Sequence, residues 1–185
     1  MNRKLIYWLL SAVLVSIIFS NSQVWAQKPG TKAPIITNTF AVDKGHYGYI
    51  WKIYLEAEDP DGEMLRIAVS VDQPGYGHYP TDWIYLKPQY QKHFKGYIQW
   101  NTFSSKAPYL TEWRQIFVRV SVFDKTGNES NEAVFPFTFQ TGPKNPYQYE
   151  LPAPFNEGNI PKLGNISIDL YEPLLMGGSG GIGLD

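Results

Sequence analysis

The stretch RQIFVRVSVFDKTGNESNEAVFPFTFQ, residues 114–140, alternates apolar and polar side chains with a period of two. Ile116, Val118, Val120 and Val122 share one parity in its first half, and Ala133 with three phenylalanines repeats the spacing in its second half. Successive side chains of a strand point to opposite faces, so this period predicts two half-buried strands. The intervening DKTGN, residues 124–128, has the composition of a tight turn. The stretch is therefore predicted to be a β-hairpin, and Pro136 in its second strand indicates an edge position.

The same period of two occurs elsewhere in the chain, whereas helical periodicity is nearly absent. Alternating segments are found at 49–57, 65–72, 98–100 and 114–123, with a further one at 132–140, an opening strand near 34–42 and a short one near 83–86. Turn residues separate them, at 43–45, 59–62, 73–75 and 124–128. About seven short strands at this spacing predict an all-β antiparallel sandwich.

Three stretches carry a resemblance: YIWKIYLEAEDPDGEMLRIAVSV, then GYIQW, then VRVSVFDKTGNESNEAVFPFTF. They resemble the bacterial immunoglobulin-like and cadherin-like extracellular domains, whose pattern has an acidic turn, a G-x-I-x-W strand and a V-x-V-x-D-x-x-G-N-x-S hairpin. The resemblance covers about residues 33–141 and implies an immunoglobulin-like antiparallel β-sandwich. The chain has no cysteine, so the disulfide of antibody domains is excluded. Trp51 and Trp100 are expected to fill the space between the sheets.

The N-terminus predicts export. A basic head, an apolar run from Leu5 to Phe19 and the small residues before position 27 form the pattern of a secretory signal peptide, residues 1–26. The apolar run is short for a bilayer span, so retention as an anchor is the weaker alternative. We therefore expect a periplasmic, extracellular or cell-surface protein with no membrane span after cleavage. The formal net charge of −1, without a basic cluster, argues against nucleic-acid binding.

Residues 142–185 differ in composition from the rest. Five prolines lie between 143 and 161, and five glycines lie between 177 and 183. We expect a Pro/Gly-rich C-terminal extension that follows the sandwich as an extended connector and ends in a frayed tail. Within it, Ile166–Leu170 alternates briefly, which would add one strand either to this domain or to a partner.

Two acidic turns are candidate metal ligands. Asp59, Asp61 and Glu63 belong to one, and Asp124 and Asn128 belong to the other. The first does not have the spacing of an EF-hand, but loops of a sandwich cluster at its ends, and calcium binds such oxygen ligands. Aspartates in similar turns of cadherin-like domains ligate calcium, which the resemblance extends to these positions. The alternative, which we favour, is that these residues only form the turns.

The aromatic segment 76–100 is a second candidate site. Tyr76, Tyr79 and Trp83 lie among glycines and prolines and are the residues most expected to be exposed for ligand binding. Packing of these rings over the core is the alternative, and composition alone favours it.

No catalytic constellation is recognisable. Three histidines without metal-ligand spacing argue against a zinc site, and no nucleophile elbow or phosphate-binding loop is present. The sequence predicts an exported non-catalytic interaction or structural module of the cell envelope or surface, with a protein partner there. Two alternatives stay open: a carbohydrate-binding module that uses the aromatics of 76–100 to bind glycan, and a calcium-stabilised cadherin-like adhesion domain.

Overall fold

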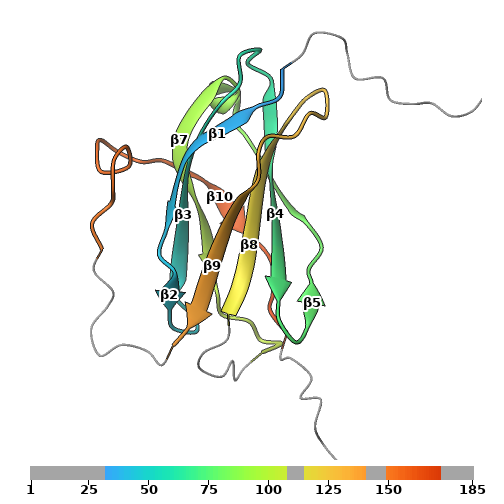
Figure 1. Cartoon of the computed structure of the whole chain (residues 1–185), viewed down its shortest axis with the longest axis vertical. Helices are drawn as coiled ribbons and strands as arrows, with labels where there is room; N and C mark the ends of the chain where they lie inside the picture. The colour runs from blue at the N-terminus through green and yellow to red at the C-terminus, as the bar shows by residue number, and fades with distance from the viewer. Residues whose placement is uncertain (1–31, 108–114, 141–148, 172–185) are drawn as a thin grey trace, which may run out of the picture. The chain divides into compact units, whose positions relative to one another are not determined.

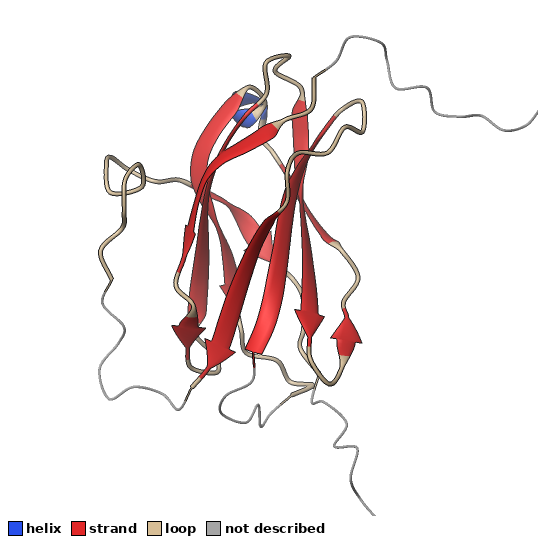
Figure 2. Ribbon diagram, viewed as in Figure 1, coloured by secondary structure: helices blue, strands red, loops and turns tan. Residues whose placement is uncertain are grey.

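The computed structural model describes residues 32–107, 115–140 and 149–171. The predicted signal peptide and the glycine-rich end therefore lie outside the described residues. Two sheets make up the fold (Figures 1 and 2). The first has the order β1 (Ile35–Ala41), β3 (Ile50–Glu58), β7 (His93–Asn101), β10 (Lys162–Ile166). The second has the order β2 (Lys44–Gly45), β9 (Ala133–Phe139), β8 (Gln115–Asp124), β4 (Met64–Gln73), β5 (Gly77–His78), with β6 (Asp82–Tyr85) also on β4.

The strand order is that of an immunoglobulin-like sandwich. One sheet contains β1, β3 and β7 and the other contains β9, β8 and β4, which corresponds to the division between the two sheets of immunoglobulin domains. These neighbours pair antiparallel, and only β2 with β9 and β10 with β7 are parallel among the described strands. A single 3₁₀ turn, η1 (Pro88–Tyr90), is the only helix of the described residues, and no helix there is long and apolar enough to cross a membrane.

The alternation read from the sequence is the alternation of burial. All four β-branched residues predicted to face inward on β8 are fully buried, and the residues between them on that strand are partly exposed or lie on the outer face. Burial of each such side chain contributes about 1.5–3 kcal/mol. The predicted β8–β9 hairpin is confirmed, and Pro136 lies on a strand whose outer neighbour, β2, pairs with it only at Thr138 and Phe139.

The two predicted core tryptophans are in contact between the sheets. Trp51 and Trp100 are cross-strand partners on β3 and β7, with ring centroids 6.3 Å apart. Phe137 of the other sheet approaches Trp51 to 4.4 Å between centroids. Aromatic rings thus link the inner faces of both layers.

The C-terminal extension has a larger role than expected. The boundary anticipated at residue 141 does not coincide with the edge of the packed unit, because β10 pairs with β7. Ile166 at the end of this strand, and Ile168 and Leu170 beyond it, all point inward and belong to the same core cluster. The physical reason is that the alternate apolar side chains of this segment are more stable when they are buried. Pairing with the edge of β7 places them in the core. Residues 149–161 contain no strand, but Phe155 within them is 2% exposed.

Candidate functional site

Three tyrosines form a stacked cluster near the β4–β5 turn. The ring centroid of Tyr76 lies 4.9 Å from that of Tyr79 and 5.0 Å from that of Tyr171, and the rings of Tyr76 and Tyr171 are parallel. Tyr79 is 3% exposed, whereas Tyr76 and Tyr171 are 44% and 36% exposed. The cluster therefore has one buried ring that supports two rings accessible to solvent.

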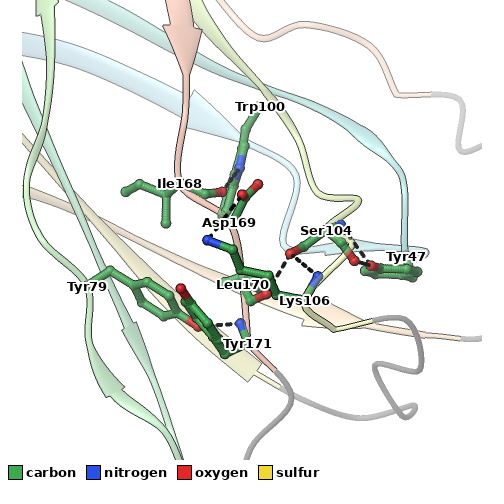
Figure 3. Close-up of polar contacts among 9 residues, drawn as sticks. All are labelled: Tyr47, Tyr79, Trp100, Ser104, Lys106, Ile168, Asp169, Leu170 and Tyr171. Atoms are coloured by element: carbon green, nitrogen blue, oxygen red, sulfur yellow. Dashed lines mark hydrogen bonds and ion pairs between the residues drawn. The ribbon is translucent and has the colours of Figure 1, made fainter.

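Polar contacts fix the buried ring and the neighbouring backbone. The Tyr79 hydroxyl donates to Oε1 of Gln73 at 2.5 Å. It also accepts from the backbone N–H of Tyr171 at 2.7 Å (Figure 3). Nε2 of Gln73 donates to the Tyr171 carbonyl at 2.8 Å, so both backbone groups of residue 171 are bound. Burial raises the pKa of Tyr79 to about 12, which keeps this hydroxyl protonated. Tyr79, one of the predicted ligand-binding residues, is therefore a structural support.

A groove adjoins the cluster, with a cavity volume of about 310 Å³. Nζ of Lys106 lies 4.9 Å from the centroid of the Tyr171 ring and 3.7 Å from Oδ2 of Asp169. The interaction with Tyr171 has the largest effect in raising the pKa of Lys106, and the interaction with Asp169 raises it further, so the ammonium stays charged. The groove thus offers an aromatic wall, a cation and a carboxylate. Its lining residues are Tyr79, Pro80, Thr81, Asp82, Lys106, Ser167, Ile168, Asp169 and Tyr171.

Trp83, the third predicted ligand-binding residue, lies on the outer face of the second sheet. It is 37% exposed, its ring is 5.4 Å from that of Phe123, and the Arg66 guanidinium carbon lies 3.9 Å from its centroid. A hollow of about 120 Å³ beside it is lined by small residues such as Ser121 and by charged residues such as Arg119. In the part of the chain that is described, no ring contact joins Trp83 to the three tyrosines, so the structure separates the predicted aromatics into two places.

An ion-pair network crosses the same outer face. Arg119 of β8 donates to Asp72 of β4 and to Glu132, each at 2.7 Å. Nδ1 of His78 lies 2.7 Å from the same Asp72. Hydrogen bonding to Arg119, and then to His78, lowers the pKa of Asp72. No motif in the sequence indicated this network, because its members come from separate strands and share no spacing.

The first acidic turn is closed by its own aspartate. Oδ1 of the buried Asp59 accepts from the N–H of Asp61 at 2.8 Å, and Oδ2 accepts from the N–H of Glu63 at 2.9 Å. Gly62 has a φ of 72°, which a non-glycine residue adopts only with strain. The carboxylate of Asp61 accepts from the backbone N–H of Lys32 at 2.7 Å. These contacts are those of an Asx turn.

The second acidic turn has the same construction. Oδ1 of Asp124 accepts from the N–H groups of Thr126 and Asn128, both at 2.8 Å, and Oδ2 accepts from Nδ2 of Asn128 at 2.7 Å. Burial acts to raise the pKa of Asp124, but the hydrogen bonds from Thr126 and Asn128 outweigh it, so the pKa is lowered. Asn128 is itself buried. Its side-chain amide thus donates a hydrogen bond within the turn.

The two acidic turns lie beside each other, as the sandwich geometry implies. The backbone N–H of Lys125 donates to the Glu63 carbonyl at 3.0 Å, and Met64 is the cross-strand partner of Asp124. Both buried carboxylates, however, are directed into their own turns. Within residues 32–107, 115–140 and 149–171, no group of three or more His, Cys, Asp or Glu side chains is placed to hold a metal ion. The contacts favour the turn interpretation, and calcium binding stays a prediction.

Comparison with solved structures gives distant similarities. The PKD domain of an M14-like peptidase from Thermoplasmatales archaeon SCGC AB-540-F20 is 16% identical with a TM-score of 0.41, and the match covers 60% of this chain and 100% of that one. Fibronectin(III)-like modules of Clostridium thermocellum CbhA are 13% identical with a TM-score of 0.39, covering 63% of this chain and 52% of theirs.

A third similarity is to the CARDB domain of the PF1109 protein from Pyrococcus furiosus, solved in complex with di-metal ions. It is 11% identical with a TM-score of 0.34, and the match covers 61% of this chain and 97% of that one. No protein-family model matches the sequence, and none of the curated proteins matches it. The strand order of the chain itself identifies its fold: it is an immunoglobulin-like β-sandwich.

Proposed function

We propose that this chain is an exported, non-catalytic interaction module that binds a protein of the cell envelope or cell surface. The leader pattern of residues 1–26 supports export, and the absence of a recognisable catalytic motif in the sequence supports a binding role. The observation that carries the proposal is the exposed, parallel pair of tyrosine rings, Tyr76 and Tyr171, held in place by a buried third ring.

A fixed aromatic pair is suited to binding. Tyrosine is enriched among the residues that dominate interface energies, since one ring buries much apolar area and has a polar end. Tyr171 is fixed through its backbone by Tyr79 and Gln73, and Tyr76 stacks on both other rings. Side chains that are ordered before binding lose less conformational entropy when the partner arrives. This surface therefore supports a contact site better than scattered exposed rings would.

The test compares two tyrosine variants as immobilised bait for envelope extract. Tyr76→Ala removes the outer ring of the cluster, and Tyr85→Ala is the matched control, because Tyr85 is 64% exposed but lies on β6. We expect the same protein to be retained by wild type and Tyr85→Ala and lost from Tyr76→Ala, as loss of a dominant contact costs at least about 2 kcal/mol. Equal retention by both variants, or turnover of peptide or glycan substrates by the purified protein, would contradict the proposal.

Glycan binding is a second candidate, supported by the groove beside Tyr171. Lys106 and Asp169 supply hydrogen-bonding groups next to an aromatic face, which is the combination that binds a sugar ring. A glycan array tests it. Signals that vanish in Tyr171→Ala but persist in Trp83→Ala would assign the groove, and the reverse pattern would assign the outer face. No binding to any glycan would end this candidate.

Calcium-stabilised adhesion is the third candidate, and the acidic turns are where it would act. Millimolar calcium is expected to raise the melting temperature if Asp61 and Glu63 ligate the ion, because a ligand that binds only the folded state stabilises it. Asp61→Ala should remove the shift. An unchanged melting temperature in wild type would leave these residues with the turn role described above.

A further inference from the structure

Residues 162–171 lie in a groove whose walls come from other segments of the chain. It differs from the groove beside Tyr171 described above, which residues of this segment help to line. Along 162–166 the segment is bound as a parallel strand to β7. Along 167–171 side chains replace the strand ladder, with five hydrogen bonds of 2.6–2.9 Å to its backbone. Their partners, some of them drawn in Figure 3, are Gln73, Tyr79, Asp82, Trp100 and Ser104.

The groove also selects the side chains of the segment. Ile166, Ile168 and Leu170 point into the core and are each at most 9% exposed. At residue 164 only glycine fits, because an added Cβ would lie 2.3 Å from Cγ2 of Ile84. A groove that binds an extended backbone and reads alternate side chains is a peptide-binding site of the strand-addition type. Its ligand in this structure is the chain's own segment.

The contacts of this segment do not depend on the route by which it arrives. The preceding residues are also held from outside, since the ring of Phe155 lies 5.7 Å from that of Tyr54, and Nζ of Lys95 donates to the Pro154 carbonyl at 3.2 Å. Phe40 also contacts Tyr149, with ring centroids 5.8 Å apart, and Lys106 pairs with Asp169. All these partners, like those of the groove, belong to residues 40–106. The covalent link instead comes from β9, through 141–148, whose sequence TGPKNPYQ contains glycine and proline. The same segment from a second copy would therefore meet identical contacts.

We propose that residues 149–171 exchange between two copies of this chain, so that each copy fills the groove of the other in a two-fold dimer. The partner is a second copy because the groove fits this segment at each inward position, including Gly164. Exchange of an identical element adds no new interface chemistry, and it needs only that the segment leave one groove and enter another. A parallel strand at a sheet edge can leave without breaking the other strand pairs.

Single cysteine variants test the exchange, since the chain has no cysteine of its own. Gln99 of β7 and Asn165 of β10 are register partners. Purified Gln99→Cys and Asn165→Cys proteins are mixed, warmed to the start of unfolding, cooled and oxidised. The control mixture pairs Asn165→Cys with Val134→Cys, an exposed position on β9 that has no register with residue 165. Circular dichroism establishes that each variant is folded.

Exchange predicts a disulfide-linked heterodimer in the Gln99→Cys mixture that grows with protein concentration, with no more than background in the Val134→Cys mixture. Equal amounts in both mixtures, or none in either, would overturn the proposal. The double variant Gln99→Cys/Asn165→Cys completes the test. Closure within single chains at every concentration would show that the segment never leaves its own groove, and failure to close at all would contradict the β7–β10 register on which exchange depends.

Discussion

Leu170→Ala tests whether the C-terminal segment is part of the core or an appendage. Leu170 is 1% exposed, and its carbonyl accepts from Oγ of Ser104 at 2.6 Å, so truncation leaves the backbone contact in place and removes only packing. Loss of the buried side chain and the cavity that remains together cost about 2–5 kcal/mol in well-packed cores. This destabilisation cannot exceed the free energy with which the segment binds to the rest of the sandwich, because a greater loss would detach the segment locally.

The assay is urea unfolding followed by tryptophan fluorescence, with wild type and Asp169→Ala as references. Asp169 neighbours Leu170, but its side chain is 54% exposed and its ion pair with Lys106 is 3.7 Å long, so its removal should cost no more than about 1 kcal/mol. We expect the midpoint to fall strongly for Leu170→Ala and slightly for Asp169→Ala, with an unchanged slope. Equal midpoints for Leu170→Ala and wild type would refute the reasoning, since a residue on a frayed tail contributes nothing to stability.

Three further predictions concern single residues. Gly164→Ala should destabilise the fold by about 1–3 kcal/mol in the same urea assay, because the added methyl group overlaps Ile84, and an unchanged midpoint would contradict the packing of β10. Tyr79→Phe should lower the free energy of unfolding by about 1–3 kcal/mol, because the N–H of Tyr171 loses its acceptor inside the protein. Amide exchange at residue 171 should become faster in this variant, and exchange equal to that of wild type would argue against this bond. The pKa of Asp124 is lower in the folded state than the value of about 3.9 in the unfolded state. Its contribution to stability is therefore present above the unfolded-state pKa and is lost as pH falls through the folded-state pKa. We expect the melting temperature of Asp124→Asn to depend less on pH below 4 than that of wild type.

The sequence allowed prediction of the sandwich because burial on a strand has a local signature. The four inward residues of β8 and the tryptophan pair all follow from a period of two. The sequence predicts about seven strands, whereas the described residues form ten, since β2 and β5 have two residues each and are too brief to show a period. For β10 the alternation was visible, but its parallel pairing with β7 was not.

The candidate site was predictable only in part. Tyr76 is exposed as expected, and Trp83 is partly so, whereas Tyr79 is buried. Tyr171, which completes the cluster, lay in a segment expected to be a connector. Its contact with Tyr79 spans 92 positions, and such long-range side-chain bonds to backbone leave no pattern in neighbouring residues. The turn residues Asp59 and Asp124, by contrast, bond within four positions, which is why turn chemistry predicted their role.

Amide exchange measured residue by residue tests the central claim most directly: residues 162–171 complete the sandwich. The N–H groups of Ser167 and Tyr171 are bound to side chains at 2.7 Å, so they should exchange slowly although no strand ladder covers them. Protection at these two residues approaching that of β7 is the predicted result. Exchange at the rate of an unstructured chain, with β7 and β8 still protected, would show that the sandwich closes without them.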